Sequence, residues 1–304
     1  MNLKKSILDS NAVSIGNFAH DLLAQPGIGR VMGVTSRGFF LLTETEQVLF
    51  LTADSLLGPI NLILTALLET VKTGLMGAEV ECSPDMLNFF QNSFQINLKD
   101  AKTWQPPELP KKVQSAQERN RQIKSVVQAI LKSGREAEFL PILKSLVSPN
   151  LKSEFSNHQV AEFIQKAVGL QRHIRDNKPT EAGWILESFL GYGPGLTPSG
   201  DDFVWGFLAA LNRWQAVLCP QFEVGQLNEM ILSVAHQKTT FLSATLIECA
   251  AHGWADANML TVLDCLYTGE GSVDDMVEKI LAYGSSSGVD AFTGMVMAIK
   301  ASKN

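Results

Sequence analysis

Residues 104–110 read Trp-Gln-Pro-Pro-Glu-Leu-Pro, and this stretch separates two parts of the chain that differ in character. Proline fixes φ and has no backbone N–H, so three prolines in five positions exclude a regular helix or strand there. The residues before the stretch favour strands and those after it favour helices. We therefore predict an α+β protein, with a mainly β domain (a small barrel or sandwich) over residues 1–105 and a larger, mainly α-helical domain over residues 111–304.

The chain before residue 105 consists of short β-favouring runs divided by turn residues. The runs cover residues 29–34, 38–42, 48–52 and 60–68. Gly74 and Gly77 lie inside a further run at 71–81 and indicate bends or bulges. Residues 86–94 suit a short helix and a strand equally well. Several short strands at this spacing are typical of a small barrel or sandwich.

After residue 110 the apolar residues recur at helical spacing, which predicts a succession of helices. The expected helices cover residues 111–133, 136–146, 156–175, 180–190, 201–218, 224–236, 242–252, 258–267, 273–283 and 289–301. Gly253 and Gly269 follow two of these segments, where glycine commonly ends a helix. The second domain is therefore expected to be mainly α-helical.

The composition is that of a well-buried globular protein, and it narrows the classes of partner. Of the 304 residues, 45% are hydrophobic and 18% are charged, and the formal net charge is −6. An acidic chain of this kind lacks the basic footprint of nucleic-acid-binding proteins, so we expect no nucleic-acid partner. Its apolar stretches are far too short to span a bilayer, so we expect no membrane partner either.

The cysteines and the N-terminal residues indicate a reducing, cytoplasmic compartment. Cys82, Cys219, Cys249 and Cys265 are isolated and form no CxxC pair, so we expect no structural zinc site and no other metal. Single cysteines are usual where thiols stay reduced. Residues 1–5 are followed by polar residues and not by an apolar core, so no secretory signal is predicted.

The strongest functional feature is a glycine-rich turn at residues 191–202, which reads Gly-Tyr-Gly-Pro-Gly-Leu-Thr-Pro-Ser-Gly-Asp-Asp. Glycine lets a ligand approach the backbone closely and proline fixes φ, so together they orient a set of N–H groups. These donors end at the start of a helix, where the helix dipole favours an anion. The groups expected to bind a small anion are the backbone at Gly193, Gly195 and Gly200 and the hydroxyls of Thr197 and Ser199. The Walker and dinucleotide patterns are both missing, so no cofactor is expected.

Two adjacent carboxylates, Asp201 and Asp202, close this turn. An Asp in the first turn of a helix often only caps it, and for one of the two this explanation is as good as a functional one. The other is a candidate catalytic residue, suited to holding a substrate amide, accepting a proton or binding Mg²⁺.

Residues 287–299 repeat the pattern of residues 199–211, because both read S-G-x-D-x-x-x-G-x-x-x-A. The pattern describes a helix start with an Asp in its first turn, followed by a ridge of small residues that lets helices approach closely. Chance similarity between two ordinary helix starts is the alternative. We expect the two starts to face a common site, which makes Asp290 a further candidate catalytic residue beside Asp202.

Two other segments supply polar groups suited to the same anion. Before the second helix start lie Ser285, Ser286, Ser287 and Gly288, and between the two starts lie Lys238, Thr239, Thr240 and Ser243. A solvated serine loop and a plain helix cap at Thr240 are the alternatives. Lys238 is the one cation close in sequence to any of these turns.

The strings GPGLTPSGDDFVWGFLAAL, TTFLSATL and GSSSGVDAFTGM follow one another in this order. Together they resemble a family long described as a domain of unknown function and now associated with the AllH subunit of oxamate carbamoyltransferase. The resemblance is strong over residues 190–300 and weaker over the N-terminal β part. It implies carbamoyl transfer between carbamoyl phosphate and oxamate, forming oxalurate and phosphate, in allantoin degradation and so in purine catabolism. It also implies a complex with two other types of subunit.

Three functions stay open at this point. The first is a subunit of a carbamoyltransferase-like enzyme that acts on a small anionic substrate. The second is a non-catalytic subunit that uses the same turns to bind a small anion or to assemble a complex. The third is a Mg²⁺-dependent, all-α hydrolase, because Gly-Asp-Asp turns at helix starts bind divalent metals. The scarcity of histidines and further acidic motifs in suitable positions argues against the third.

Overall fold

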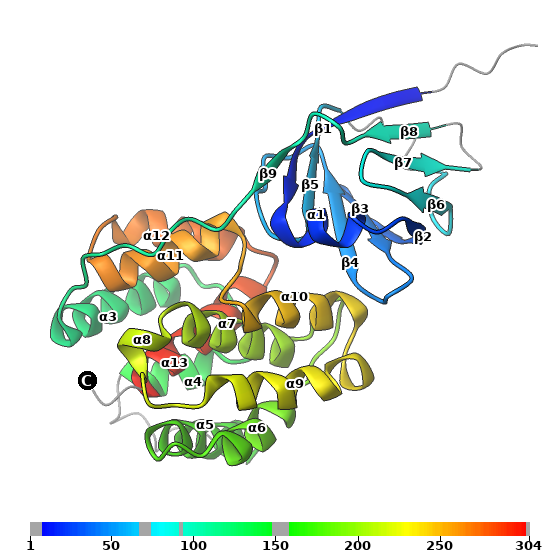
Figure 1. Cartoon of the computed structure of the whole chain (residues 1–304). Helices are drawn as coiled ribbons and strands as arrows, with labels where there is room; N and C mark the ends of the chain where they lie inside the picture. Colours follow the sequence, from blue (N-terminus) through cyan, green and yellow to red (C-terminus); the bar gives the residue numbers. More distant parts are fainter. Residues whose placement is uncertain (1–7, 67–73, 91–93, 148–157, 302–304) are drawn as a thin grey trace, which may run out of the picture. The chain divides into compact units, whose positions relative to one another are not determined.

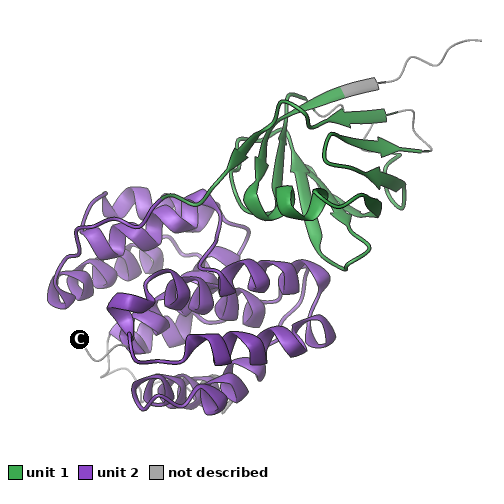
Figure 2. Ribbon diagram, in the orientation of Figure 1, with its two compact units in different colours: residues 1–107 green, residues 108–304 purple. Residues whose placement is uncertain are grey.

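The computed structural model of the chain describes residues 8–66, 74–90, 94–147 and 158–301. The chain divides into two compact units, residues 1–107 and residues 108–304 (Figure 2). The first unit is mainly β and the second is helical (Figure 1), so the α+β prediction is confirmed.

The described residues of the first unit form a closed barrel and one short helix. Its elements are β1 (Leu8–Gly16), α1 (Asn17–Leu23), β2 (Gly27–Val34), β3 (Gly38–Leu42), β4 (Val48–Thr52), β5 (Asn61–Leu64), β6 (Glu79–Cys82), β7 (Met86–Phe89), β8 (Phe94–Asn97) and β9 (Lys102–Trp104). The strand order is β5-β4-β3-β2-β6-β7-β8-β1, and the ring closes where β1 pairs with β5. The first residues of β1 pair with β8, and its later residues pair with β5. β9 also pairs with the end of β1 but is not one of the strands of the ring.

Alternating apolar side chains fill the barrel, as its small diameter requires. Phe39, Leu41, Leu51 and Leu62 are fully buried, and Phe39 meets Phe89 edge-on with ring centroids 5.8 Å apart. In the undecided segment at 86–94, the described residues form strand β7 and the first residue of β8. The portions of the predicted runs at 67–73 and 91–93 lie outside the described residues.

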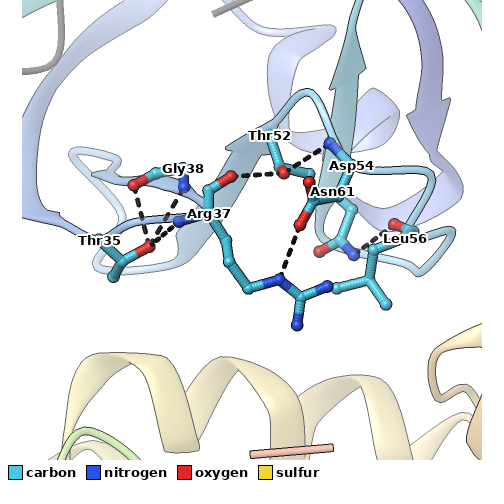
Figure 3. Close-up of polar contacts among 7 residues, drawn as sticks. All are labelled: Thr35, Arg37, Gly38, Thr52, Asp54, Leu56 and Asn61. Atoms are coloured by element: carbon cyan, nitrogen blue, oxygen red, sulfur yellow. Dashed lines mark hydrogen bonds and ion pairs between the residues drawn. The ribbon is translucent and has the colours of Figure 1, made fainter. Parts of the chain in front are cut away.

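A polar network ties the β2–β3 turn to the loop that follows β4 (Figure 3). The buried hydroxyl of Thr52 donates to the carbonyl of Arg37 at 2.6 Å, and Arg37 Nε binds Asp54 Oδ2 at 2.7 Å. The buried amide of Asn61 donates to Leu56 O at 2.8 Å. Arg37 and Asp54 are both about half exposed, so their ion pair contributes little to stability. The buried hydrogen bonds of Thr52 and Asn61 contribute more than this ion pair to the stability of this end of the barrel.

The second unit contains helices of very different burial. They are α3 (Ala116–Lys132), α4 (Leu140–Val147), α5 (His158–Arg175), α6 (Pro179–Glu187), α7 (Ser199–Arg213), α8 (Gln215–Leu218), α9 (Val224–Lys238), α10 (Phe241–Ala251), α11 (Ala257–Thr268), α12 (Val273–Ala282) and α13 (Ser287–Ala301). Nearly every residue of α7 and α13 is buried, and the two helices make the most extensive helix–helix contact of the unit. These two helices therefore form the centre of the helical core (Figure 1).

The predicted helices are confirmed, but several boundaries differ for identifiable reasons. The first helix begins at Ala116 and not at 111, because Ser115 and Glu118 form a reciprocal capping box there. The single helix predicted at 201–218 is wrong: Trp214 leaves the helical conformation, with φ −114° and ψ 21°, and separates α7 from α8. Residues 156 and 157 of another predicted helix lie outside the described residues.

Glycine ends two helices as predicted. Gly269 closes α11 in the left-handed conformation with φ 79°, and Gly253 follows α10 with φ 74°. Among the described residues, no helix combines the length and the hydrophobicity that a membrane crossing requires.

Candidate functional site

The crossing of α7 and α13 is built on reciprocal glycines. A Cβ at Gly206 would lie 2.0 Å from the Ala291 carbonyl oxygen, and one at Gly294 would lie 2.0 Å from the Phe203 carbonyl oxygen. Only glycine allows backbones to approach this closely. The prediction that the small-residue ridges pack helices tightly is therefore confirmed, and each ridge packs against the helix that carries the other.

The two helix starts share the same local construction. The N–H of Gly200 donates to Tyr192 O, and the N–H of Gly288 donates to Tyr283 O, both at 2.8 Å. A Cβ at either glycine would lie 1.9 Å from a carbonyl oxygen of the segment before its turn. The similarity of the sequence motifs thus corresponds to similar backbone contacts, although the two loops differ in length.

Each motif contacts the other through its Ser and Asp side chains. The hydroxyls of Ser287 and Thr197 lower the pKa of Asp202, and the hydroxyl of Ser199 lowers that of Asp290, so these groups lie close together. The Thr197 and Ser287 hydroxyl oxygens are 3.2 Å apart and hydrogen-bond each other. The Asp of each motif therefore lies beside the Ser of the other, and the two helix starts lie side by side.

Burial makes these two carboxyls unusually weak acids. It is the largest influence on Asp290 and raises its pKa to about 6, although the Phe139 N–H and the Ser199 hydroxyl lower it. Burial also raises the pKa of Asp202 well above its ordinary value, and the charge of Asp290 raises it further. The Oδ2 atoms of both are buried and have no hydrogen-bond partner among the described residues. Because buried polar atoms are nearly always paired, these two oxygens point to a ligand or an ordered water.

Asp201 has a different role from Asp202. Its Oδ1 accepts from the Gly191 N–H at 2.7 Å, and its Oδ2 accepts a short hydrogen bond from the Thr239 hydroxyl. It caps no helix, because α7 has no side-chain cap, so the capping explanation is wrong for this residue. Burial raises its pKa, and the bonds from Thr239, Gly191 and Ser243 oppose that rise. Both oxygens are engaged in holding the turn.

The segment between α9 and α10 holds the glycine-rich turn from the other side. Thr240 Oγ1 caps α10 by accepting from the Ser243 N–H at 3.1 Å, as its sequence context suggested, and it donates to Leu196 O at 2.6 Å. The ammonium group of Lys238 binds Glu187 at 2.7 Å, so its charge is already paired. The structure thus brings Thr240 and Ser243 to the turn and directs the Lys238 charge to α6.

The exposed part of the turn carries the remaining predicted anion ligands. Gly193 and Gly195 have φ of 109° and 101°, and both are exposed, as is Ser285 before α13. Ser286 is half-buried, and its backbone carbonyl accepts from the Asp290 N–H at 3.1 Å. These groups lie on the two turns that precede α7 and α13.

Arg135 brings a cation to the second turn, and no sequence pattern predicts this. Its Nη1 donates to Ser285 O at 2.8 Å and its Nη2 to Leu281 O at 3.2 Å. Together with Tyr283 and Ser286 it lines a shallow hollow. Arg135 lies about 150 residues before this turn and in no motif, so only the tertiary fold reveals it.

Two other contributions come from the start of α4. The backbone N–H of Phe139 donates to Asp290 Oδ1 at 2.8 Å. The neighbouring Glu138 accepts from the Tyr192 hydroxyl at 2.8 Å, and its charge raises the pKa of Asp290. A backbone donor leaves no trace in side-chain patterns, which is why the sequence did not predict it.

The arrangement combines donors for an anion with carboxyl groups able to hold or accept a proton. Two helix N-termini and several hydroxyls lie beside the buried Asp202 and Asp290. A carboxyl with a pKa of about 6 accepts a proton near neutral pH more readily than an ordinary carboxylate does. Within the described parts of the chain, no three His, Cys, Asp or Glu side chains gather in a way that suits a metal ion.

A protein-family model matches part of the chain. No solved structure matches the chain. The matching segment begins just before the glycine-rich turn, ends within α13, and covers a little over a third of the chain. The resemblance found in the motifs is therefore confirmed for the part that carries both helix starts: residues 189–299 are similar to the family described as oxamate carbamoyltransferase subunit AllH.

Proposed function

We propose that this chain is a subunit of a carbamoyltransferase-like enzyme and that its paired helix starts bind a small carbamoyl-bearing anion. The observation that carries the proposal is the reciprocal pair of buried carboxyls. Each lies beside a Ser of the other motif, and each has an Oδ2 with no hydrogen-bond partner among the described residues. The similarity of residues 189–299 to the AllH subunit supports it, because that segment contains both motifs.

The substrates implied by that family suit the groups at the site. Carbamoyl phosphate and oxamate are small anions, and each carries an H₂N–C=O group. The backbone at Gly193 and Gly195 and the hydroxyls of Thr197 and Ser286 would bind the anionic ends. The carboxyls of the site would face the amide ends.

The reaction needs one proton to leave the attacking nitrogen. The amide nitrogen of oxamate attacks the carbamoyl carbon, the bond from that carbon to the phosphate oxygen breaks, and phosphate leaves. Asp202 or Asp290 would accept the proton from the nitrogen and return it to the departing phosphate, giving oxalurate and phosphate. Asp201 would position the glycine-rich turn, because both its oxygens already hold it.

The name of the family also implies partner subunits, and we propose that this chain works in such a complex. The second candidate function is that of a non-catalytic, anion-binding subunit. The many hydrogen bonds that fix the position of the glycine-rich turn favour it. Comparing carbamoyl transfer by the isolated chain, by the partners without it and by the full complex separates the two.

The direct test is the rate of carbamoyl transfer by the complex that carries Asp202→Asn or Asp290→Asn. Loss of a general base lowers a rate by about a hundredfold or more. Asp274→Asn is the matched control, because Asp274 also lies in the first turn of a helix but is exposed. Wild-type rates in both site variants would refute the catalytic assignment.

A further inference from the structure

The segment between α3 and α4 (residues 133–139), the α3–α4 connector, contacts both helix starts. Arg135 in this connector donates from Nη1 to Ser285 O at 2.8 Å, in the turn before α13. Glu138 accepts from the Tyr192 hydroxyl at 2.8 Å, in the glycine-rich turn before α7. Because Arg135 and Glu138 are only three positions apart in sequence, one short piece of backbone joins the two turns.

The same connector donates a backbone N–H to Asp290. The Phe139 N–H binds Asp290 Oδ1 at 2.8 Å, and the Asp290 side chain is fully buried. This N–H belongs to the peptide unit that joins Glu138 to Phe139. A peptide unit is planar, so the direction of its N–H follows from the orientation of the whole unit. Contacts at either end of the unit therefore determine whether the N–H points at Asp290.

The side chains of Phe139 and Glu138 hold the two ends of this peptide unit. The Phe139 ring is fully buried and meets the Phe163 and Phe189 rings edge-on, with centroids 5.3 and 5.6 Å away. Glu138 is exposed, so burial does not fix its end of the unit. The hydrogen bond to Tyr192 supplies this second attachment.

Tyr192 is itself fixed to the first helix start. Its carbonyl accepts from the Gly200 N–H at 2.8 Å, and its half-buried ring meets the Phe163 ring at 70° with centroids 4.7 Å apart. Its hydroxyl therefore has a defined position beside the glycine-rich turn. The bond from Tyr192 to Glu138 thus links the geometry of the first helix start to the carboxyl of the second, Asp290.

We propose that Glu138 and Tyr192 are positioning residues of the site: their hydrogen bond orients the 138–139 peptide unit and so aligns the Asp290 carboxyl. In this role neither side chain touches the substrate. The inference rests on the proposed function and deepens it, because Asp290 is one of the two carboxyls that would move the proton.

The charges around Asp290 allow the hydrogen bond to be separated from simple electrostatics. The Phe139 N–H lowers the pKa of Asp290, whereas the charge of Glu138 raises it. The charges of Asp202 and Arg135, the other charged groups of the two turns and the connector, stay the same in every variant below. Losing the Tyr192 hydroxyl should weaken the Phe139 contact and raise the Asp290 pKa, whereas losing only the Glu138 charge should lower it.

The first test is a pH titration of the Phe139 N–H signal in a ¹H–¹⁵N NMR spectrum of the full-length chain, because this N–H binds the titrating carboxyl. We expect Tyr192→Phe to move the midpoint up by about half a unit, part of what a hydrogen bond to a charged group contributes. Glu138→Gln should move it down, because the Gln oxygen still accepts from Tyr192 while the charge is gone.

Two matched controls should leave the midpoint unchanged. Tyr267→Phe removes a buried hydroxyl that has no hydrogen-bond partner among the described residues. Glu136→Gln removes an exposed charge from the same connector. Circular dichroism of all four variants checks that they fold.

The second test is the rate of carbamoyl transfer by the complex. Tyr192→Phe should lower kcat by about tenfold, the effect of one hydrogen bond, and should change KM for oxamate by less than twofold. Glu138→Gln should keep kcat at high pH, and the acidic limb of its pH–rate profile should move to lower pH. Tyr267→Phe should match the wild type.

The outcomes separate this inference from the proposed function. A wild-type midpoint or a wild-type kcat in Tyr192→Phe refutes the positioning role, as does a loss of kcat that Tyr267→Phe shares. A downward midpoint in both Tyr192→Phe and Glu138→Gln also refutes it. If the wild-type complex transfers no carbamoyl group, the proposed function fails, while the NMR titration still shows whether the Tyr192–Glu138 bond aligns Asp290.

Discussion

Replacing Asp290 by Asn should stabilise the protein at neutral pH and leave its stability at acidic pH unchanged. Burial raises the pKa of Asp290 from 3.8 to about 6 in the folded state, about two units, which corresponds to about 3 kcal/mol. The folded form therefore holds the proton more tightly than the unfolded form. The stability that this carboxyl contributes is fully present below pH 3.8 and is lost as the pH rises through 6.

An asparagine has the shape of the protonated acid and cannot ionise, so it avoids this loss. Its oxygen can still accept the Phe139 N–H, which Asp290 Oδ1 binds at 2.8 Å. Urea unfolding would be followed by tryptophan fluorescence, because four of the five tryptophans lie after residue 108. The free energy of unfolding of the variant should exceed that of the wild type by about 3 kcal/mol at pH 7.5 and by close to zero at pH 4. A difference in free energy of unfolding that does not grow with pH would refute the assignment of a buried, weakly acidic carboxyl.

Three other changes test the architecture around the site. Gly294→Ala should destabilise the protein by roughly 1–3 kcal/mol, because its Cβ would lie 2.0 Å from a carbonyl oxygen of α7. The control Gly225→Ala, which has open space around it, should stabilise the protein by up to about 1 kcal/mol. Equal melting temperatures of the two variants would contradict this. Thr239→Val should lower the free energy of unfolding, measured in urea, by about 1–3 kcal/mol, because a buried oxygen of Asp201 loses its hydrogen-bond donor. An unchanged urea midpoint would contradict the contribution of that contact to stability. Arg135→Gln should weaken oxamate binding in calorimetry, since it removes the guanidinium bonds to Ser285 in the turn before α13 and to Leu281 in α12. An unaltered affinity would exclude a role for this cation.

The sequence predicted the parts of the molecule that local chemistry determines. The proline-rich stretch, the succession of helices and the glycine caps at Gly253 and Gly269 follow from single residues or short patterns. The repeated S-G-x-D motif also led to the correct packing of α7 on α13, because glycine in a helix interior is costly unless a close neighbour requires it.

The rest depends on tertiary contacts that no short pattern encodes. Phe139 contributes a backbone N–H, and Arg135 reaches its turn across about 150 residues. Asp201 could not be told from Asp202 in sequence, because only the fold brings Gly191 and Thr239 to one carboxylate and leaves the other with a free oxygen. Lys238 precedes the Thr239–Ser243 segment in sequence, but its ammonium group pairs with Glu187 in the fold.

The central claim is that the two helix starts hold one small carbamoyl-bearing anion between them, and a crystal structure of the chain with oxamate tests it most directly. We expect oxamate in contact with both the 193–202 turn and the 285–290 turn, with its amide toward the free oxygens of Asp202 and Asp290. Oxamate bound elsewhere on the chain, with both turns unoccupied, would contradict the claim.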